Sequence, residues 1–114
     1  MAKWHGYTQA IRVADLREQI DLQDATTPTD GNIAPTYANH VTGLWAEVLE
    51  TAGGEYLRGR QIEANVRAVI TIRYRSDVTP RMRVKWGTRY LYVKTVHSAP
   101  GRTYTVLDCS EVQP

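Results

Sequence analysis

The chain has 114 residues, of which 42% are hydrophobic and 23% are charged, and its formal net charge is only +2. These values predict one globular domain with a single hydrophobic core, and they give no compositional indication of a nucleic-acid-binding protein. The single cysteine excludes an internal disulfide framework, and no apolar run is long enough to cross a bilayer, so no membrane partner is expected.

The N-terminal third of the chain contains one predicted strand and one long predicted loop. Residues 1–14 lack both a periodicity and the apolar core of a signal peptide, so we expect an N-terminal extension, made in the cytosol, before a domain over 15–114. Alternating apolar residues predict a strand at about 19–23. Residues 24–40 contain two prolines, an Asp-Gly pair and many Thr, Asn and Asp residues, which predicts a loop. A loop of this length is uncommon unless it has a function.

The next two segments are a strand and a second candidate loop. Apolar residues alternate over 41–50, which predicts a strand, with Gly43 as a bulge or a close approach. Residues 51–61 link this strand to the next one, and they contain Gly53 and Gly54 near their start. Within them, 55–58 is predicted to form a single helical turn that is too short to be stable alone. This connection is the second candidate for a functional segment.

The most regular pattern in the chain lies at residues 62–75, which read IEANVRAVITIRYR. Every even position is apolar, and every odd position except Val69 is polar or charged. Because strand side chains alternate between two faces, this period predicts one long amphipathic strand rather than a helix. Its apolar face requires cover from the rest of the chain.

The C-terminal part predicts three more strands, separated by turns. They are 81–86, 90–97 and 103–112, with turns at 76–80, 87–88 and 98–102. In the first of them, Met82, Val84 and Trp86 are predicted to face inward. The fold class is therefore all-β: a small six-stranded barrel or sandwich in meander order, with long loops and at most one short helical turn.

Residues that could support catalysis or metal binding form no motif. The candidate soft metal ligands are His5, His40, His97 and Cys109, and their spacing matches no zinc or haem site. No nucleophile elbow is present, and the glycine pair lacks the context of a phosphate-binding loop. We therefore predict a protein that is not an enzyme and needs no cofactor or metal, with Cys109 as a small core residue.

Cations on the outward faces form the strongest candidate surface. They are Arg67, Arg73, Arg75, Arg81, Arg83 and Lys85. If strand 62–75 pairs with strand 81–86, these side chains form one contiguous patch. A solvated exterior, a protein–protein interface and phosphate contact all remain open for it. Tyr74 and Trp86 have the opposite parity from the cations, which argues against binding of single-stranded nucleic acid.

Several stretches occur in an order typical of one family. They are LREQIDLQ at 16–23, LWAEV at 44–48, GGEYLRGRQIEA at 53–64, ITIRYRSDVTPRMRVKWGTRYLYVKTV at 70–96 and TYTVLDCSEV at 103–112. In this order the chain resembles the tailed-phage head–tail joining proteins, also called head-closure or stopper proteins. The run IRYRSDVTPRMRVKWGTRYLYV is the most specific part of the resemblance.

The resemblance implies a small β-barrel that forms a ring of six or twelve subunits beneath the portal and its adaptor. Such a ring retains the packaged double-stranded DNA and receives the tail. The family's closing segment connects its second and third strands, and it maps onto 50–61 in this chain. The candidate channel-closing residues are Gly53, Gly54, Glu55, Tyr56, Leu57, Arg58 and Arg60. The glycines would act as a hinge, and the two arginines would meet DNA phosphate.

The resemblance also implies protein partners. The expected ones are the neighbouring subunits of the ring, the portal or adaptor on the head side and the tail terminator on the tail side. The candidate interface residues are Arg67, Arg73, Arg75, Arg81, Arg83, Asp30 and Tyr37. The expected location is the neck of a virion assembled in the host cytoplasm, in a phage, a prophage or a gene transfer agent. The alternative function is an OB-like nucleic-acid-binding barrel.

Overall fold

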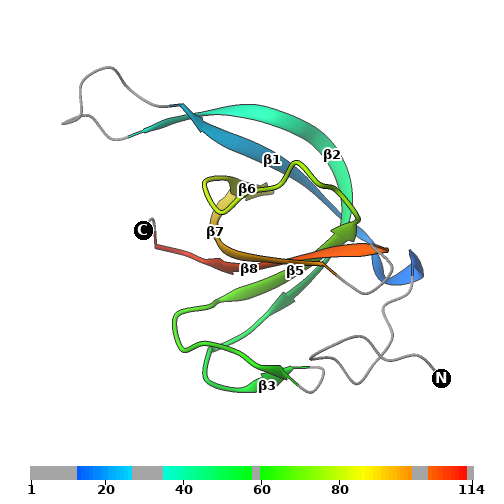
Figure 1. The fold of residues 1–114 in the computed structure, drawn as a ribbon, viewed down its shortest axis with the longest axis vertical. Coiled ribbons are helices and arrows are strands. Elements are labelled where there is room, and N and C mark those ends of the chain that lie inside the picture. The colour runs from blue at the N-terminus through cyan, green and yellow to red at the C-terminus, as the bar shows by residue number, and fades with distance from the viewer. Residues whose placement is uncertain (1–12, 27–34, 58–59, 99–102, 113–114) are drawn as a thin grey trace.

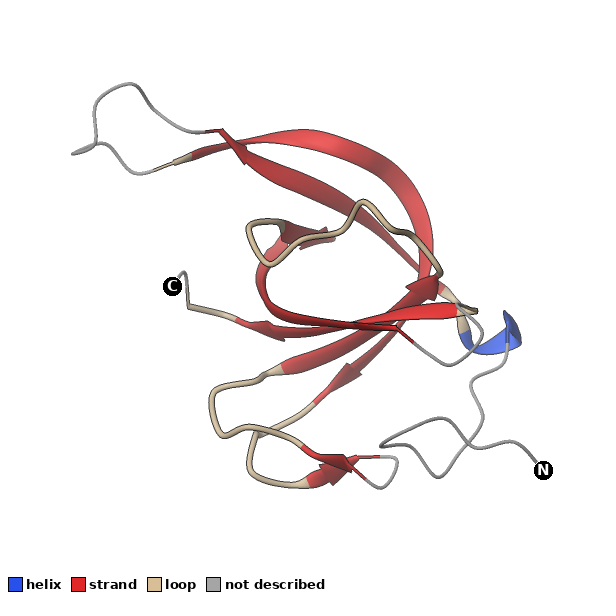
Figure 2. Cartoon of the chain, in the orientation of Figure 1, coloured by secondary structure: helices blue, strands red, loops and turns tan. Residues whose placement is uncertain are grey.

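The computed structural model describes residues 13–26, 35–57, 60–98 and 103–112, and most of them form β-strands (Figures 1 and 2). Six strands form a closed barrel, and two very short strands form a separate hairpin. The elements are η1 (Val13–Asp15), β1 (Glu18–Thr26), β2 (Thr36–Glu50), β3 (Tyr56–Leu57), β4 (Arg60–Gln61), β5 (Ala68–Arg73), β6 (Arg83–Trp86), β7 (Arg89–Ser98) and β8 (Tyr104–Ser110). The predicted all-β barrel is confirmed.

The order of strands around the barrel is β1-β2-β5-β8-β7-β6, with β6 returning to β1. The predicted meander is therefore wrong at one point. Strands β5 and β6 are consecutive barrel strands in the chain, yet they are separated by two strands on either side. β5 pairs with β2 and β8, whereas β6 pairs with β1 and β7, so every neighbour is antiparallel and no edge is left open.

Strands β1 and β2 form a long hairpin that extends beyond the barrel wall (Figure 1). The predicted loop over 24–40 is wrong in extent, because β1 continues to Thr26 and β2 begins at Thr36. The pairing register shifts between Ile20 and Leu22, opposite Gly43. Gly43 has a φ of +69°, and its N–H donates to Asp21 Oδ1 at 3.0 Å. The predicted bulge at this glycine is confirmed.

The barrel interior is filled by apolar side chains from all six strands and from the connection between β5 and β6. The fully buried members of this cluster include Ile20, Leu22, Ile70, Ile72, Val84, Leu91, Val93 and Leu107. Met82 and Val84 are buried and Trp86 packs against them, as the alternation over 81–86 predicted. Cys109 is completely buried as well, and burial raises the pKa of its thiol. Its predicted role as a core residue is confirmed.

The predicted strand over 62–75 is more than twice as long as the strand that forms. Only Ala68–Arg73 is extended and paired, and the preceding residues turn, with the Val66 N–H donating to the Glu63 carbonyl at 3.1 Å. Ile62 and Val66 are nonetheless almost fully buried. They pack on the outside of the barrel against Val69. Their apolar character therefore reflects a second small cluster and not a continuation of β5.

This outer cluster covers the sides of β5 and β8 that face away from the barrel interior. Its buried members are Leu16, Ile62, Val66, Val69, Tyr104 and Val106, and Leu57 packs against them. The helical turn predicted over 55–58 is wrong, because Tyr56–Leu57 forms β3, which pairs with β4 in a small hairpin. An isolated two-stranded hairpin has little stability in water, so its packing on the barrel is what holds it.

Replacement of Ile70 by alanine tests the barrel core. Ile70 is fully buried, so the substitution should lower the free energy of unfolding by about 2–5 kcal/mol through lost burial and the cavity left behind. Val112→Ala is the control, because Val112 is 77% exposed and its loss should change stability by less than about 0.5 kcal/mol. Urea denaturation measures both. Equal effects of the two substitutions would contradict this core.

Candidate functional site

Residues 51–67 form one structural unit on the outside of the barrel, which we call the covering segment. Both of its ends are held by the barrel: the Thr51 N–H donates to the Arg67 carbonyl at 3.0 Å, and the Arg67 N–H donates to the Cys109 carbonyl at 2.8 Å. Within it, the Gly54 N–H donates to the Ile62 carbonyl, and the Ile62 N–H donates to the Glu55 carbonyl. The described candidates among the channel-closing residues therefore lie in a folded layer and not in an open loop.

Gly53 is required where the covering segment folds back on itself. Its φ is +80°, and a Cβ atom there would lie 2.2 Å from the Ala64 carbonyl oxygen. Any other residue would be strained and would displace the backbone of the opposite limb. Gly54 also has a positive φ, but it has open space around it. The expected hinge at this pair stays a prediction, since the structure shows a tight turn in one conformation.

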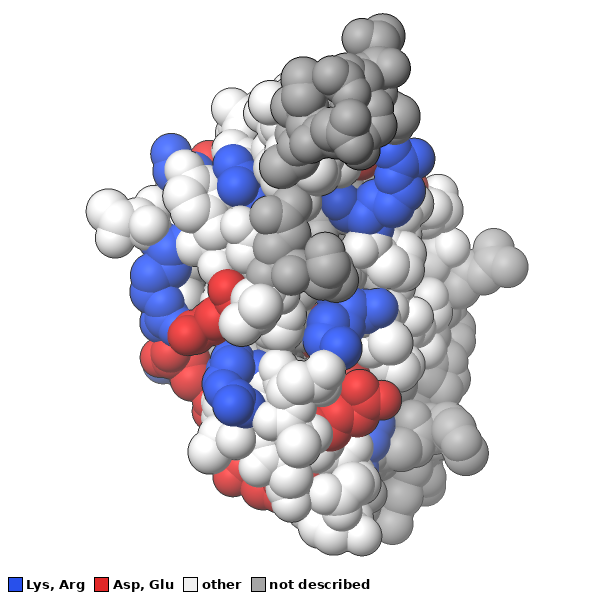
Figure 3. Space-filling model, turned by 90° about the vertical axis from the view of Figure 1, so that its left-hand side faces the viewer, with Lys and Arg blue, Asp and Glu red and all other residues white. Residues whose placement is uncertain are grey.

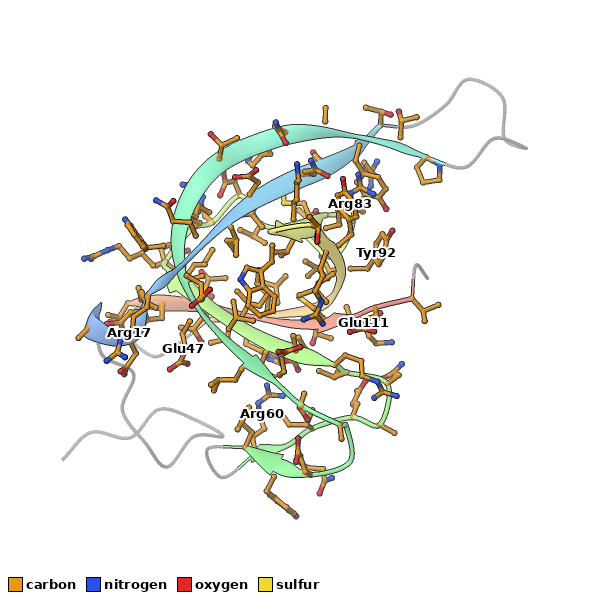
Figure 4. The ribbon with its side chains drawn as sticks, turned by 180° about the vertical axis from the view of Figure 1, so that it is seen from behind. Arg17, Glu47, Arg60, Arg83, Tyr92 and Glu111 are labelled. Atoms are coloured by element: carbon orange, nitrogen blue, oxygen red, sulfur yellow. The ribbon has the colours of Figure 1, made fainter. Side chains whose placement is uncertain are left out.

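An ion pair between Arg60 on β4, which is labelled in Figure 4, and Asp108 on β8 fastens the β3–β4 hairpin to the barrel. Arg60 Nη1 and Nη2 donate to the two carboxylate oxygens of Asp108 at 2.8 and 2.6 Å. Thr95 Oγ1 and His97 Nε2 lie 3.2 Å from Asp108 Oδ2. Arg60, expected to meet DNA phosphate, thus has a carboxylate partner within its own chain.

The environment of Asp108 favours its charged form. Burial raises the pKa of Asp108, whereas hydrogen bonds from His97 and Arg60 lower it. The net result is a pKa lowered from 3.8 to about 2. Sequence reasoning did not identify Asp108 or His97 as members of a network. The one available signal is an aspartate in an otherwise buried strand, because β8 is buried along its whole length.

Tyr56 is the one aromatic residue in the sequence of the covering segment, and 72% of its surface is accessible. Leu57 turns the other way and packs against the outer cluster. The Glu55 carboxylate accepts from the Thr51 hydroxyl and from the Ala52 N–H, so it caps the start of the segment. Arg58 lies outside the described residues. Among the described candidates, Tyr56 is therefore the side chain best placed to contact another molecule.

The expected contiguous patch of cations does not form, because β5 and β6 do not pair. Arg67 donates to the carbonyl oxygens of Ala52 and Ala64 within the covering segment. Arg75 forms an ion pair with Asp77, which His40 also contacts. These two hydrogen bonds hold the pKa of Asp77 well below its usual range.

The other candidate interface residues lie apart from one another. Arg73 is exposed at the end of β5, and Arg81 is exposed before β6. Asp30 lies outside the described residues.

Arg83 and Tyr37, two of the expected interface residues, are brought together by the structure. The Arg83 guanidinium lies between two tyrosine rings, 4.1 Å from the Tyr37 centroid and 4.0 Å from that of Tyr90. Its Nε donates to Gln23 Oε1 at 2.7 Å, and the Tyr92 ring makes an edge contact with Tyr37 (Figure 4). Tyr90 and Tyr92 were not among the predicted site residues. The sequence did contain a signal for them: on the predicted strand over 90–97 they alternate with Leu91 and Val93, so they lie on the outward face when those two residues are buried.

An open depression of about 420 Å³ lies where β1, β2 and β5 meet η1. It is lined by Leu16, Arg17, Trp45 and Arg73. Trp45 is 55% exposed there, between two arginines. Indole and guanidinium groups together are common at protein contact sites, so this surface is a further place where a partner can dock.

The described histidines lie beside aspartates and belong to no metal-binding group. His40 and His97 each contact an aspartate, and no group of three or more His, Cys, Asp or Glu side chains within the described ranges could hold a metal ion. His5 lies outside those ranges. Likewise, no helix there has the length and apolar character needed to cross a membrane.

Comparison with known proteins identifies a family for almost the whole chain. Residues 11–112 match the family described as phage head completion protein. A similar fold occurs in the solution structure of protein SF1141 from Shigella flexneri 2a, with a TM-score of 0.60, 23% identity, and coverage of 89% of this chain and 96% of that one.

A chain in the virion of a native gene transfer agent particle has a similar fold as well, with a TM-score of 0.58, 20% identity, and coverage of 84% and 94%. At these identities the two structures establish likeness of fold alone. No curated protein sequence gives a match.

Replacement of Asp108 by asparagine tests the network that fastens the hairpin. Because the pKa of Asp108 is lowered from 3.8 to about 2, its charge contributes stability that is complete above about pH 4 and is lost as the pH falls through about 2. Asp108→Asn should therefore lower the free energy of unfolding by on the order of 2 kcal/mol at pH 7. The difference from wild type should shrink between about pH 4 and pH 2.

Urea denaturation at several pH values measures this difference. Asp24→Asn is the control for the change in net charge. A difference that stays constant over the acidic range would show that the charge of Asp108 does not hold the hairpin.

Proposed function

Because the chain belongs to the phage head completion protein family, whose members are structural proteins of the head–tail neck and not enzymes, we propose that it closes the channel of a filled head. In this proposal, copies of the chain form a ring between the portal or adaptor and the tail. The ring retains the packaged double-stranded DNA and offers a surface for tail attachment. Six or twelve copies are proposed.

The observation that best supports this proposal is the folded covering segment on one side of a closed barrel. The barrel gives a rigid body, while the β3–β4 hairpin presents Tyr56 on its surface. Placed around a common axis, equivalent hairpins from several copies would bring their Tyr56 side chains into the bore. Aromatic side chains in contact can form a closed layer at little conformational cost.

The docked hairpin is proposed as the resting state of the closing segment. Movement of the hairpin away from the barrel has to break the buried Arg60–Asp108 pair and expose Leu57, and loss of one partner from such a pair is costly. Any opening motion would therefore turn about Gly53 and Gly54 only when contact with a partner compensates this loss. Arg58 remains a proposed phosphate contact, whereas Arg60 is proposed to act as a fastener.

The partner surfaces are proposed to lie away from the hairpin. The depression beside Trp45 is a candidate for contact with the adaptor or the tail-side protein, and the cluster around Arg83 is a candidate for contact with a neighbouring subunit or another partner. Arg73 in the depression and Arg83 in the cluster retain their proposed interface roles. Arg67 and Arg75 are less suited to such contacts, because their guanidinium groups already bond within the chain.

A nucleic-acid-binding barrel remains as the second candidate, and one observation favours it. The sequence predicted that aromatic residues and cations lie on opposite faces of their own strands. In the structure, however, tyrosines of β7 lie beside the cations of the neighbouring strand β6. Tyr92 pairs with Arg83 and Tyr90 pairs with Lys85 across the two strands. Alternation of cations and aromatic rings is a feature of surfaces that bind single-stranded nucleic acid.

Replacement of Tyr56 by alanine tests the closing role. The side chain is largely exposed, so the variant should fold and assemble with thermal stability close to wild type. Heads completed with it should lose DNA more readily, because the proposed aromatic layer across the bore is missing. The measurement is the fraction of DNA-filled heads by electron microscopy after incubation, with Thr88→Ala in the exposed β6–β7 turn as the control. Equal DNA retention by the two variants would count against closure by this hairpin.

A salt titration separates the two candidate functions. A barrel that binds nucleic acid through several phosphate contacts should lose about 10³-fold or more in affinity between 50 and 200 mM salt. The isolated head completion protein should instead show only weak DNA binding over this range. Gel-shift assays with single-stranded and double-stranded DNA measure this. Tight, steeply salt-dependent binding that Arg83→Gln abolishes would favour the second candidate.

A further inference from the structure

Two walls of the barrel that point in opposite directions each carry an available charged group, which is a pair of cations on one wall and the Glu63 carboxylate on the other. In the closed order of six strands, β5 and β6 are three positions apart in both directions, so they lie on opposite walls. The β6 wall carries Arg83 and Lys85, and the β5 wall is covered by the covering segment. Figure 3 shows basic and acidic side chains interspersed on the face that it presents, so neither sign of charge forms a continuous patch there.

On the β6 wall, Arg83 is held in place with its hydrogen-bonding edge unused. Two tyrosine rings cover its flat faces and Gln23 accepts from its Nε, but no described residue bonds to its Nη1 or Nη2. Lys85 lies two residues further along and likewise has no bonded partner among the described side chains. Asp21 is opposite Lys85 on β1, and its carboxylate accepts from the Gly43 N–H. A stacked arginine loses little conformational entropy when it binds a carboxylate.

On the β5 wall, Glu63 is the acidic side chain of the described covering segment that is available for contact. Arg60 is paired with Asp108, and Arg67 donates to backbone carbonyls of the same segment. Glu63 is exposed in the turn before Val66, and its carboxylate makes no bond to any described residue. Glu63 therefore offers a carboxylate to which a cation of another copy can bind.

We propose that the Arg83–Lys85 face of one copy binds the Glu63 turn of the next copy around the ring. This inference rests on the proposed ring, and it names the contact that builds it. A head-to-tail ring requires two different, complementary surfaces on each subunit, and opposite walls of the barrel meet that requirement. Arginine and tyrosine at the centre of such a contact are typical of the residues that dominate binding energy.

Arg83 suits this contact better than the other arginines of the chain. Arg75 is already paired with Asp77. Arg73 belongs to β5, so it lies on the same wall as the Glu63 turn and not opposite to it. The contact uses the turn at Glu63, and it leaves Tyr56 at the other end of the covering segment available for the bore.

Zero-length cross-linking of the wild-type chain gives the first test. A carbodiimide joins an amine directly to a carboxylate, so contact between copies should produce an amide between Lys85 and Glu63 of different chains. Mass spectrometry of the cross-linked multimers identifies it, with mixed isotope-labelled and unlabelled chains to prove that the link is intermolecular. A wild-type chain that stays monomeric at about millimolar concentration, where contacts as weak as about −4 kcal/mol are populated, would overturn the proposal. Multimers that lack this link would overturn it as well.

Charge reversal gives the second test, with self-association measured by native mass spectrometry. Arg83→Glu and Glu63→Arg should each weaken association by at least about tenfold, because each places like charges across the contact. Mixing the two variants should restore association in even-numbered assemblies, since every contact is then again between opposite charges. Thr79→Glu, which adds a negative charge in the exposed connection between β5 and β6, is the control and should associate like wild type.

The outcomes also separate this contact from the proposed function. Thermal unfolding first shows that each variant is folded. If the mixture does not recover, or if the Thr79 control weakens association equally, the contact is overturned. If Arg83→Glu completes heads like wild type, the contact fails while the neck function stands. If the wild-type chain cannot complete heads at all, the function fails. Loss of DNA binding by Arg83→Glu with unchanged self-association would assign this face to nucleic acid and overturn the contact.

Discussion

The burial of strand β5 on both of its faces is the constraint on which the rest of the structure depends. Ala68, Ile70 and Ile72 point into the barrel core, whereas Val69 and Thr71 are buried on the outside. A strand in a small barrel needs an outer cover only if its outer face is apolar. Such a cover stabilises the fold, because each Å² of apolar surface removed from water contributes about 25 cal/mol to the free energy of folding. The covering segment supplies that cover through Ile62 and Val66, which fixes where its hairpin can act.

Polar contacts then determine how firmly the cover is held. Apolar packing alone would allow the β3–β4 hairpin to shift, because a two-stranded hairpin has few contacts of its own. The Arg60–Asp108 pair adds geometry, since a bidentate guanidinium–carboxylate contact is satisfied in one orientation. His97 and Thr95 complete the coordination of the buried carboxylate. The pair therefore holds the hairpin in one orientation on the barrel, as the proposed contacts around a ring require.

Local patterns in the sequence predicted the all-β class, the inward faces over 68–72 and 81–86, and the turn at Gly87. The same patterns failed where a residue is apolar because of a contact with a distant part of the chain. Ile62 and Val66 fall on the same even positions as Ile70, so they were predicted to share its face. In the structure they pack on the outside of the barrel wall, whereas Ile70 packs on the inside. The pairing of Arg83 with Tyr37 depends on closure between β1 and β6, which no local signal specifies. The arginine patch failed for the same reason, because neighbouring strands in sequence are opposite strands in space.

In the proposed ring, the covering segment faces the channel. The measurement that tests it most directly is a cryo-electron microscopy map of the neck in completed heads, at a resolution that traces the chain. The account predicts a ring of barrels in which the hairpin of Tyr56–Leu57 and Arg60–Gln61 lies nearest to the symmetry axis. A ring whose bore is lined by the β1–β2 hairpin, with the covering segment on its outer surface, would contradict it.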